Sequence, residues 1–184
     1  MKYLLIILSL FFITEVMGQK MEEITHREVN VHYNDSSIKA NILLEAKKIK
    51  TNTSRDYYWY YNNSINVNQG DYKSRVLDGA YQVLARDGKL ITKGSFKKGC
   101  KTGEWKRWNT SGKLTLITNW KQGIKEGKYQ KFEHGVLVEQ GNYCKNRLTG
   151  INQKFSNRKL IEKGRYKKGV LHGKLISYEA DTIL

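Results

Sequence analysis

The 184-residue sequence predicts an all-β fold, an elongated single-layer antiparallel ribbon built from β-hairpin repeats. Two observations predict it: a pattern that recurs every 23 or 24 residues, and short β-rich stretches separated by glycine-bearing turns. A period of this length is typical of stacked supersecondary units that contact only their neighbours. At roughly 4.8 Å per strand, ten to eleven strands would give a ribbon about 45 to 55 Å long.

Residues 1–18 have the composition of a signal peptide. Lys2 supplies a positive charge, and an apolar run follows from Tyr3 to Ile13. The run is much shorter than the roughly 20 residues that a spanning helix needs. Cleavage is expected between Gly18 and Gln19. The sequence therefore predicts a secreted or periplasmic protein with no transmembrane segment after cleavage.

Residues 19–55 differ in character from the rest of the chain and are expected to form an N-terminal capping segment. Ile38, Ile42, Ala46 and Ile49 recur at helical spacing, which predicts a short helix over about 37–49. A stacked repeat fold needs its open edge covered to remain soluble, so this segment is expected to cap the first hairpin. A functional arm is the alternative.

Residues 56–184 are expected to hold about five and a half repeat units, the first of them degenerate. The clearest copy, Gly103 to Glu126, contains two β-rich stretches joined by a Thr-Ser-Gly turn. Turn positions that need a positive φ are most readily filled by Gly or Asn. The units begin at Asp56, Gly79, Gly103, Gly127, Gly150 and Gly173, and the expected turn residues are Gly88, Gly112, Gly135 and Asn157 at one end and Gly99, Gly123, Asn146 and Gly169 at the other.

Period-two alternation in the second strand of each unit places a leucine, a glycine and an aromatic residue on one face. In one copy these are Leu90, Gly94 and Phe96. The glycine leaves a gap that a ring from a neighbouring strand could fill. The opposite face is expected to be basic and solvated. In the first strand Trp105 and Trp108 are spaced by three, so they lie on opposite faces unless a bulge turns one of them.

The motif Gly-x-Trp/Tyr-x-x-Trp/Phe, a turn glycine, Lys-Leu and Gly-x-Tyr-Lys-x-Gly resembles the MORN repeat in its bacterial variant, the YwqK-like antitoxin-type family. The best matches lie at 103–114, 141–150 and 164–174, and the resemblance covers about 56–184. Asn152 and Leu175 depart from it where an aromatic is expected, as does Thr118 in place of glycine. The resemblance implies membrane-surface attachment or protein scaffolding, and it transfers no residue role.

The positive charge of the chain is concentrated on the repeats. Residues 79–184 hold 23 Lys and Arg against eight Asp and Glu, whereas residues 19–78 hold nine against eight. Such a bias favours acidic partners such as anionic lipid, acidic glycan or an acidic protein surface. Export makes nucleic acid an unlikely partner. Alternatively, exposed lysines only keep the sheet soluble and block edge pairing.

Two cysteines, Cys100 and Cys144, lie two units apart. Two hairpins span about 19 Å at roughly 4.8 Å per strand, whereas a disulfide needs Cα atoms within about 7 Å. Free thiols are therefore expected, although an exported protein often forms disulfides.

The sequence contains no pattern that indicates catalysis. None of the four histidines has a partner at metal-ligand spacing, and the glycines follow the repeat period instead of forming a phosphate-binding loop. We expect no enzyme activity, no cofactor and no metal site.

Aromatic and cationic residues interleave in the repeats, which is typical of surfaces that bind lipid, glycan or single-stranded nucleic acid. The alternative is that the rings serve only as the hydrophobic core of a thin sheet. The leading hypothesis is a protein–protein interaction module, with an antitoxin or immunity-like role as the version that the resemblance implies. Binding to anionic membrane phospholipid and to acidic polysaccharide are the alternatives. The candidate binding surface comprises Trp105, Arg107, Trp108, Trp120, Tyr129, Phe132, Tyr143, Lys163, Arg165, Tyr166 and Lys167.

Overall fold

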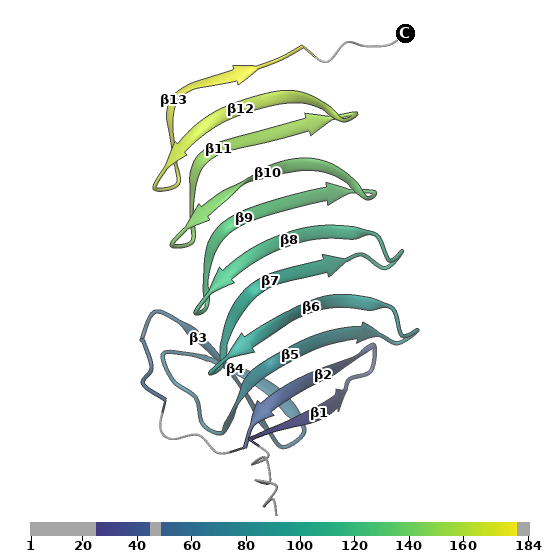
Figure 1. The fold of residues 1–184 in the computed structure, drawn as a ribbon. Coiled ribbons are helices and arrows are strands. Elements are labelled where there is room, and N and C mark those ends of the chain that lie inside the picture. The colour runs from purple at the N-terminus through teal and green to yellow at the C-terminus, as the bar shows by residue number, and fades with distance from the viewer. Residues whose placement is uncertain (1–24, 45–48, 180–184) are drawn as a thin grey trace, which may run out of the picture.

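The structure is a computed structural model that describes residues 25–44 and 49–179, and these residues form antiparallel β-strands without a helix (Figure 1). The predicted signal peptide, with Gly18 and Gln19, lies outside the described residues. The strands are β1 (His26–His32), β2 (Ser36–Leu43), β3 (Asp56–Tyr61), β4 (Ser64–Gln69), β5 (Arg75–Ala85), β6 (Leu90–Lys97), β7 (Cys100–Trp108), β8 (Leu114–Lys121), β9 (Ile124–Glu133), β10 (Val136–Cys144), β11 (Arg147–Ser156), β12 (Lys159–Lys167) and β13 (Val170–Ser177).

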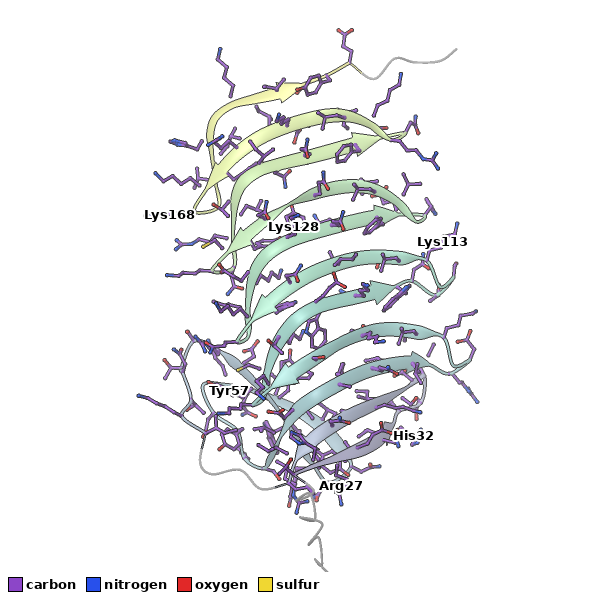
Figure 2. All side chains as sticks on the ribbon, viewed as in Figure 1. Arg27, His32, Tyr57, Lys113, Lys128 and Lys168 are labelled. Atoms are coloured by element: carbon purple, nitrogen blue, oxygen red, sulfur yellow. The ribbon has the colours of Figure 1, made fainter. Side chains whose placement is uncertain are left out.

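The predicted hairpin ribbon is confirmed. Eleven strands follow one another in a single open sheet, in the order β1-β2-β5-β6-β7-β8-β9-β10-β11-β12-β13. From β6 to β12 each strand pairs with the strands before and after it in the sequence, so this part of the sheet grows in chain order from bottom to top in Figure 1. The turns line up along two edges of the ribbon. Figure 2 shows Lys113 at one of these edges and Lys168 at the other.

The turns have the backbone conformation that the glycine pattern predicts. Gly99 and Gly123 both adopt a positive φ, and each follows a residue that is also at positive φ, Lys98 and Gln122 respectively. Two successive residues at positive φ are the signature of a type I′ hairpin turn, whose twist matches that of the strands. Where glycine is missing, Asn146 takes the same conformation at φ 65°.

The first repeat copy forms a hairpin but does not join the ladder. Strands β3 and β4 lie off the main path, and β3 pairs with only the beginning of β5, through Trp59 and Val76 and through Tyr60 and Arg75. The N-terminal hairpin β1–β2 takes the place beside β5 instead, with Ala40 opposite Tyr81. The N-terminal segment, expected to cap the first repeat hairpin, thus pairs with β5 and not with the β3–β4 hairpin of the first copy.

The predicted helix over 37–49 is wrong for the part that the structure describes, because residues 36–43 form β2. Residues 45–48 lie outside the described residues. The helical interpretation rested on a spacing of four between Ile38 and Ile42, which is also a multiple of the strand period of two. Ala40 lies between them, and Ala40 and Ile42 are fully buried. This alternation is the strand pattern.

One row of side chains crosses the sheet and alternates large and small residues. Tyr81 on β5 faces Gly94 on β6, and Tyr129 on β9 lies between Thr118 on β8 and Gly141 on β10. A Cβ at Gly94 would lie 2.2 Å from the indole of Trp105. The predicted filling of each glycine gap by a neighbouring ring is therefore confirmed here. We call the side of the sheet that carries this row the groove face.

Bulges recur in every hairpin of the ladder from β5 to β12. The register shifts immediately before Trp108, at the point where the sequence left open a bulge or rings on both faces. A second set of irregularities falls at the glycines that open the repeat units, such as Gly103 and Gly127, which have positive φ inside a strand. These glycines allow the odd-numbered strands to bend, as the ribbon shows (Figure 1).

The core is concentrated at the N-terminal end of the ladder. Its central cluster comprises Val29, Ala40, Ile42, Leu77, Phe96 and Trp105, and side chains from β3 and β4, including Tyr58, Tyr60 and Ile65, pack against it. Beyond β8 the sheet has a single layer, and all residues of β13 are exposed. The off-path hairpin therefore provides a second layer only at one end.

Candidate binding groove

An open groove of about 450 Å³ runs along the groove face over β5 to β9, and Tyr58 of β3 contributes to its wall. Its lining is Tyr58, Tyr81, Val83, Thr92, Phe96, Lys101, Trp105, Arg107, Leu116, Thr118, Trp120 and Lys125. These side chains share a face because they alternate with residues of the opposite face along each strand. The groove therefore combines an aromatic floor with three cations.

The aromatic floor is a continuous cluster at the end where β3 packs on the sheet. The Phe96 ring lies 4.8 Å from that of Tyr58 and 5.1 Å from that of Trp105, the latter edge to face. Tyr81 contacts both Phe96 and Trp105. The indole nitrogen of Trp105 donates to backbone carbonyls of Ser95 and Thr102, each at 3.2 Å. Trp105 is thus a buried core residue as well as a wall of the groove.

Lys101 projects between three aromatic rings. Its Nζ lies 4.6 Å from the ring centre of Trp105, 4.9 Å from that of Trp120 and 5.3 Å from that of Tyr58. Burial lowers the pKa of Lys101 below its ordinary value, the charges of Arg107 and Lys125 lower it further, and Asp56 acts in the opposite direction. The rings partly replace the water that the ammonium group loses.

Lys125 repeats this arrangement one hairpin further along. Its Nζ lies 5.8 Å from the Trp120 ring centre and 5.1 Å from that of Tyr143. Lys101 and Lys125 therefore approach the same Trp120 ring from neighbouring hairpins. Among the described residues, the ion pairs that the chain forms include neither of these lysines nor Arg107.

The residues of the sequence-predicted surface fall into separate groups. Trp105, Arg107 and Trp120 line the groove, and Tyr129, Tyr143 and Tyr166 continue along the same face on β9, β10 and β12. Phe132 lines a different hollow near the β9–β10 turn, with Leu137 and Phe155. Trp108 is half-buried at the end of β7. The structure does not bring all eleven residues into one site.

The cations predicted on β12 lie on the other side of the sheet. A Cβ at Gly164 would contact Leu171, Leu175 and Tyr166, so Gly164 belongs to the groove face. Lys163, Arg165 and Lys167 alternate with it and point to the opposite face. Arg165 and Lys167 are exposed. The chain thus carries cations on both faces.

The sequence prediction missed Tyr58, Tyr81, Lys101 and Lys125. Tyr58 comes from the degenerate first copy, and only its packing against Phe96 brings it to the groove. Lys101 and Lys125 could not be distinguished by residue type from the other lysines of the repeats. Their position distinguishes them, because each lies directly opposite the aromatic residue next to the end of the preceding strand, Lys101 opposite Phe96 and Lys125 opposite Trp120.

A polar cluster continues the groove face beyond the groove. Tyr129 donates a 2.6 Å hydrogen bond to Glu139, and Asn152 donates to the Tyr129 hydroxyl. Lys131 donates to the other oxygen of Glu139 at 2.7 Å. Burial raises the pKa of Tyr129 above its ordinary value, and the bond to Glu139 raises it further. Asn152, where the repeat pattern expects an aromatic, is therefore held by hydrogen bonds.

The prediction of free cysteines is confirmed. Cys100 is buried near Tyr57, whereas Cys144 is exposed. Burial raises the pKa of the Cys100 thiol, which keeps it protonated at neutral pH.

Within the described ranges, no group of three or more His, Cys, Asp or Glu residues is placed to hold a metal ion. Residues 25–44 and 49–179 also contain no helix of the length and apolar character needed to cross a membrane. Neither the protein-family models nor the curated proteins that were compared with this chain give a match.

Proposed function

We propose that this protein is a non-catalytic interaction module that binds a protein partner through the groove face of its β-ribbon. The observation that carries the proposal is the position of Lys101, whose charged group sits among three aromatic rings in an open groove. A lysine that served only solubility would extend into water, where its charge is best solvated. The aromatic residues that surround this ammonium group are of the types enriched at protein–protein interfaces.

The depth and the openness of the groove also support the proposal. Trp105 is buried at 6% exposure and belongs to the core, but Trp120, Arg107, Lys101 and Lys125 remain half-buried or exposed around an open space. Aromatic residues and arginine are the types most enriched where protein interfaces derive their binding energy. If the rings served only as core, burial would account fully for Trp105, whereas Trp120 packs against the same core cluster but stays partly exposed in the groove.

The proposal includes export, because residues 1–18 have the composition of a signal peptide. A secreted or periplasmic interaction module could act as an antitoxin or immunity-like protein, which is the role that the resemblance to the MORN-repeat variant implies. A toxic protein encoded beside this one, and captured by it, would support that version of the proposal.

Photo-crosslinking from the two faces of one strand tests the proposal. Leu116 and Ile117 are neighbours on β8, both half-buried, and only Leu116 lines the groove. A benzoylphenylalanine at each position would be activated in cells that produce the protein. We expect one dominant protein adduct from position 116 and none of that mass from position 117. An adduct from position 117 alone, or no adduct from either position, would refute binding through the groove face.

Peripheral attachment to anionic membranes is a second candidate, favoured by the cations on the opposite face of β12. Each lysine or arginine near an anionic surface contributes on the order of 1 kcal/mol, so three on one face would give measurable binding. Sedimentation with phosphatidylglycerol vesicles at low salt should then depend on Lys163, Arg165 and Lys167. Absence of sedimentation would eliminate this candidate.

A further inference from the structure

The repeat units are not equivalent along the groove face, and their differences gather in one place. The position opposite the aromatic at the end of the preceding strand is Lys101 on β7 and Lys125 on β9. On β11 and β13 the same position is Leu148, opposite Tyr143, and Leu171, opposite Tyr166. A leucine there is the simpler structural solution, because it packs on the ring without placing a charge among aromatic side chains. The two lysines are therefore departures from the structural pattern.

A second set of equivalent positions shows the same contrast. Lys131 on β9 forms a 2.7 Å ion pair with Glu139, and Lys154 on β11 forms one of 2.9 Å with Glu162. The corresponding cation on β7 is Arg107, which faces Thr92 on one side and Leu116 on the other. The later units thus supply a carboxylate to this cation from the neighbouring strand, and the β7 unit does not.

Three cations without an ion pair among the described residues, Lys101, Arg107 and Lys125, therefore meet in one groove. We propose that this groove binds an acidic segment of the partner protein, whose carboxylates take the place that Glu139 and Glu162 occupy in the later units. This inference rests on the proposed function and specifies the chemistry of its ligand. An extended segment presents alternate side chains on one side at about 7 Å spacing. Carboxylates two residues apart can approach the ammonium groups on either side of Trp120.

The lining of the groove favours a peptide over the other anionic ligands. Sugar hydroxyls both donate and accept hydrogen bonds, and sites for them need acceptors as well as donors. The described residues that line the groove include no carboxylate and no side-chain amide, so their side-chain acceptors are limited to the hydroxyl groups of two tyrosines and two threonines. Apart from the three cations and two threonines, Thr92 and Thr118, their surface is Val83, Leu116 and aromatic residues, which suits apolar side chains between the carboxylates. A bilayer surface is wide and could not bring its headgroups to the recessed Lys101.

Two triple variants with the same change in net charge test the inference. The groove triple is Lys101→Gln, Arg107→Gln and Lys125→Gln. The control triple, Lys163→Gln, Arg165→Gln and Lys167→Gln, removes three cations from the opposite face. Thermal melting of both would verify folding. The probe is a fluorescein-labelled eleven-residue peptide with glutamate alternating with leucine and tyrosine, and its counterpart carries glutamine in place of glutamate.

Fluorescence anisotropy with the purified protein should show the glutamate peptide binding at least about tenfold more tightly than the glutamine peptide, since charged hydrogen bonds are the stronger ones. The groove triple should lose that difference, while the control triple should stay within about twofold of the parent protein. Equal losses of peptide affinity in both triple variants would show that the peptide responds only to the net charge of the protein, and this would overturn the inference. Binding of an oligogalacturonate probe with the same dependence on the groove triple would also overturn it, in favour of an acidic glycan.

The two proposals fail in different ways. If position 116 crosslinks a partner but the groove triple neither weakens that crosslink nor changes peptide binding, the interaction module stands and the acidic-segment inference is wrong. If the glutamate peptide binds through the groove but no partner crosslinks at position 116, the groove chemistry stands and the proposed function is wrong.

Discussion

Gly94 and Trp105 occupy a common space on the groove face, where a Cβ at position 94 would lie 2.2 Å from an indole carbon. The indole Nε1 also donates hydrogen bonds to the backbone carbonyls of Ser95 and Thr102. Trp105 therefore has little freedom to move away from a larger residue. The glycine that the repeat pattern places here is required for space, since its φ is not positive.

The first prediction concerns Gly94→Ala. The added methyl group must displace the indole from the cluster with Tyr81 and Phe96, so the free energy of unfolding should fall by about 1–3 kcal/mol, as overpacking usually does. Urea denaturation followed by tryptophan fluorescence measures it. Ser95→Ala, next to it on the exposed side of β6, should change stability by less than about 0.5 kcal/mol. Equal effects of the two substitutions would contradict the close approach.

The second prediction concerns Glu139. Burial alone would raise the pKa of Glu139, but hydrogen bonds from Lys131, Tyr129 and Asn152 outweigh it and hold the pKa below the ordinary value. A lowered folded-state pKa stabilises the fold above the unfolded-state pKa, and that contribution disappears as the pH falls through the folded-state value. Glu139→Gln should therefore destabilise the protein at pH 7 by about 1–3 kcal/mol.

The difference between the parent protein and Glu139→Gln should narrow as the pH falls from about 5 to about 3. Denaturation midpoints at several pH values measure this. Glu133→Gln, an exposed position at the end of the neighbouring strand β9, controls for the loss of one negative charge. A stability difference between the parent protein and Glu139→Gln that stays constant down to pH 3 would contradict the lowered pKa of Glu139.

The third prediction separates stability from binding at Lys101. Burial lowers the pKa of this lysine, so at neutral pH the fold carries the cost of a charged group in a partly dry site. Methionine keeps the aliphatic packing and removes the charge. Lys101→Met should leave the free energy of unfolding unchanged or raise it by up to about 1 kcal/mol, while the affinity for the glutamate peptide falls.

The pH dependence of stability provides a second check on this prediction. A lowered lysine pKa makes the parent protein gain stability as the pH rises through that pKa, so any advantage of Lys101→Met should shrink at alkaline pH. Lys93→Met, at an exposed position on β6, is the control. Destabilisation of Lys101→Met by more than about 1 kcal/mol at pH 7 would mean that the ring contacts of the ammonium group outweigh its desolvation.

The fourth prediction concerns the thiols. Cys144 is exposed, whereas Cys100 is buried and has a raised pKa. A thiolate-directed reagent such as Ellman's reagent should modify one cysteine rapidly in the folded protein and the second only after unfolding. Cys144→Ser should abolish the rapid phase. Rapid modification of both cysteines in the folded protein would show that the end of the core around Tyr57 opens readily.

The ladder and its turns could be predicted from the sequence because they depend on local chemistry. A residue such as Gly99 or Asn146 marks a turn wherever it stands, and the two-residue alternation around Gly94 assigns faces without knowledge of neighbouring strands. The spacing of the hairpins follows from the 23 or 24 residue period. The same period correctly separated Cys100 from Cys144.

The two ends of the chain and the groove could not be predicted so well, because they depend on which strands become neighbours. Residues 36–43 join the ladder as a strand because β5 offers an edge that they can bury against. The degenerate first copy leaves the ladder and brings Tyr58 to Lys101. Arg107 and Lys131 occupy equivalent positions, but the adjacent strand places Glu139 opposite Lys131 and Leu116 opposite Arg107. The sequence of one repeat unit does not show which residue will lie opposite.

The off-path hairpin β3–β4 gives the ribbon two unlike ends, and this asymmetry has a consequence for how the chain matures. Once the chain as far as β7 is free to fold, the central core cluster, with Leu77, Phe96 and Trp105, can already close. Each later hairpin then docks on a finished edge, and its contacts are made with residues synthesised shortly before it. Chain growth and sheet growth thus proceed in the same direction, towards the exposed β13.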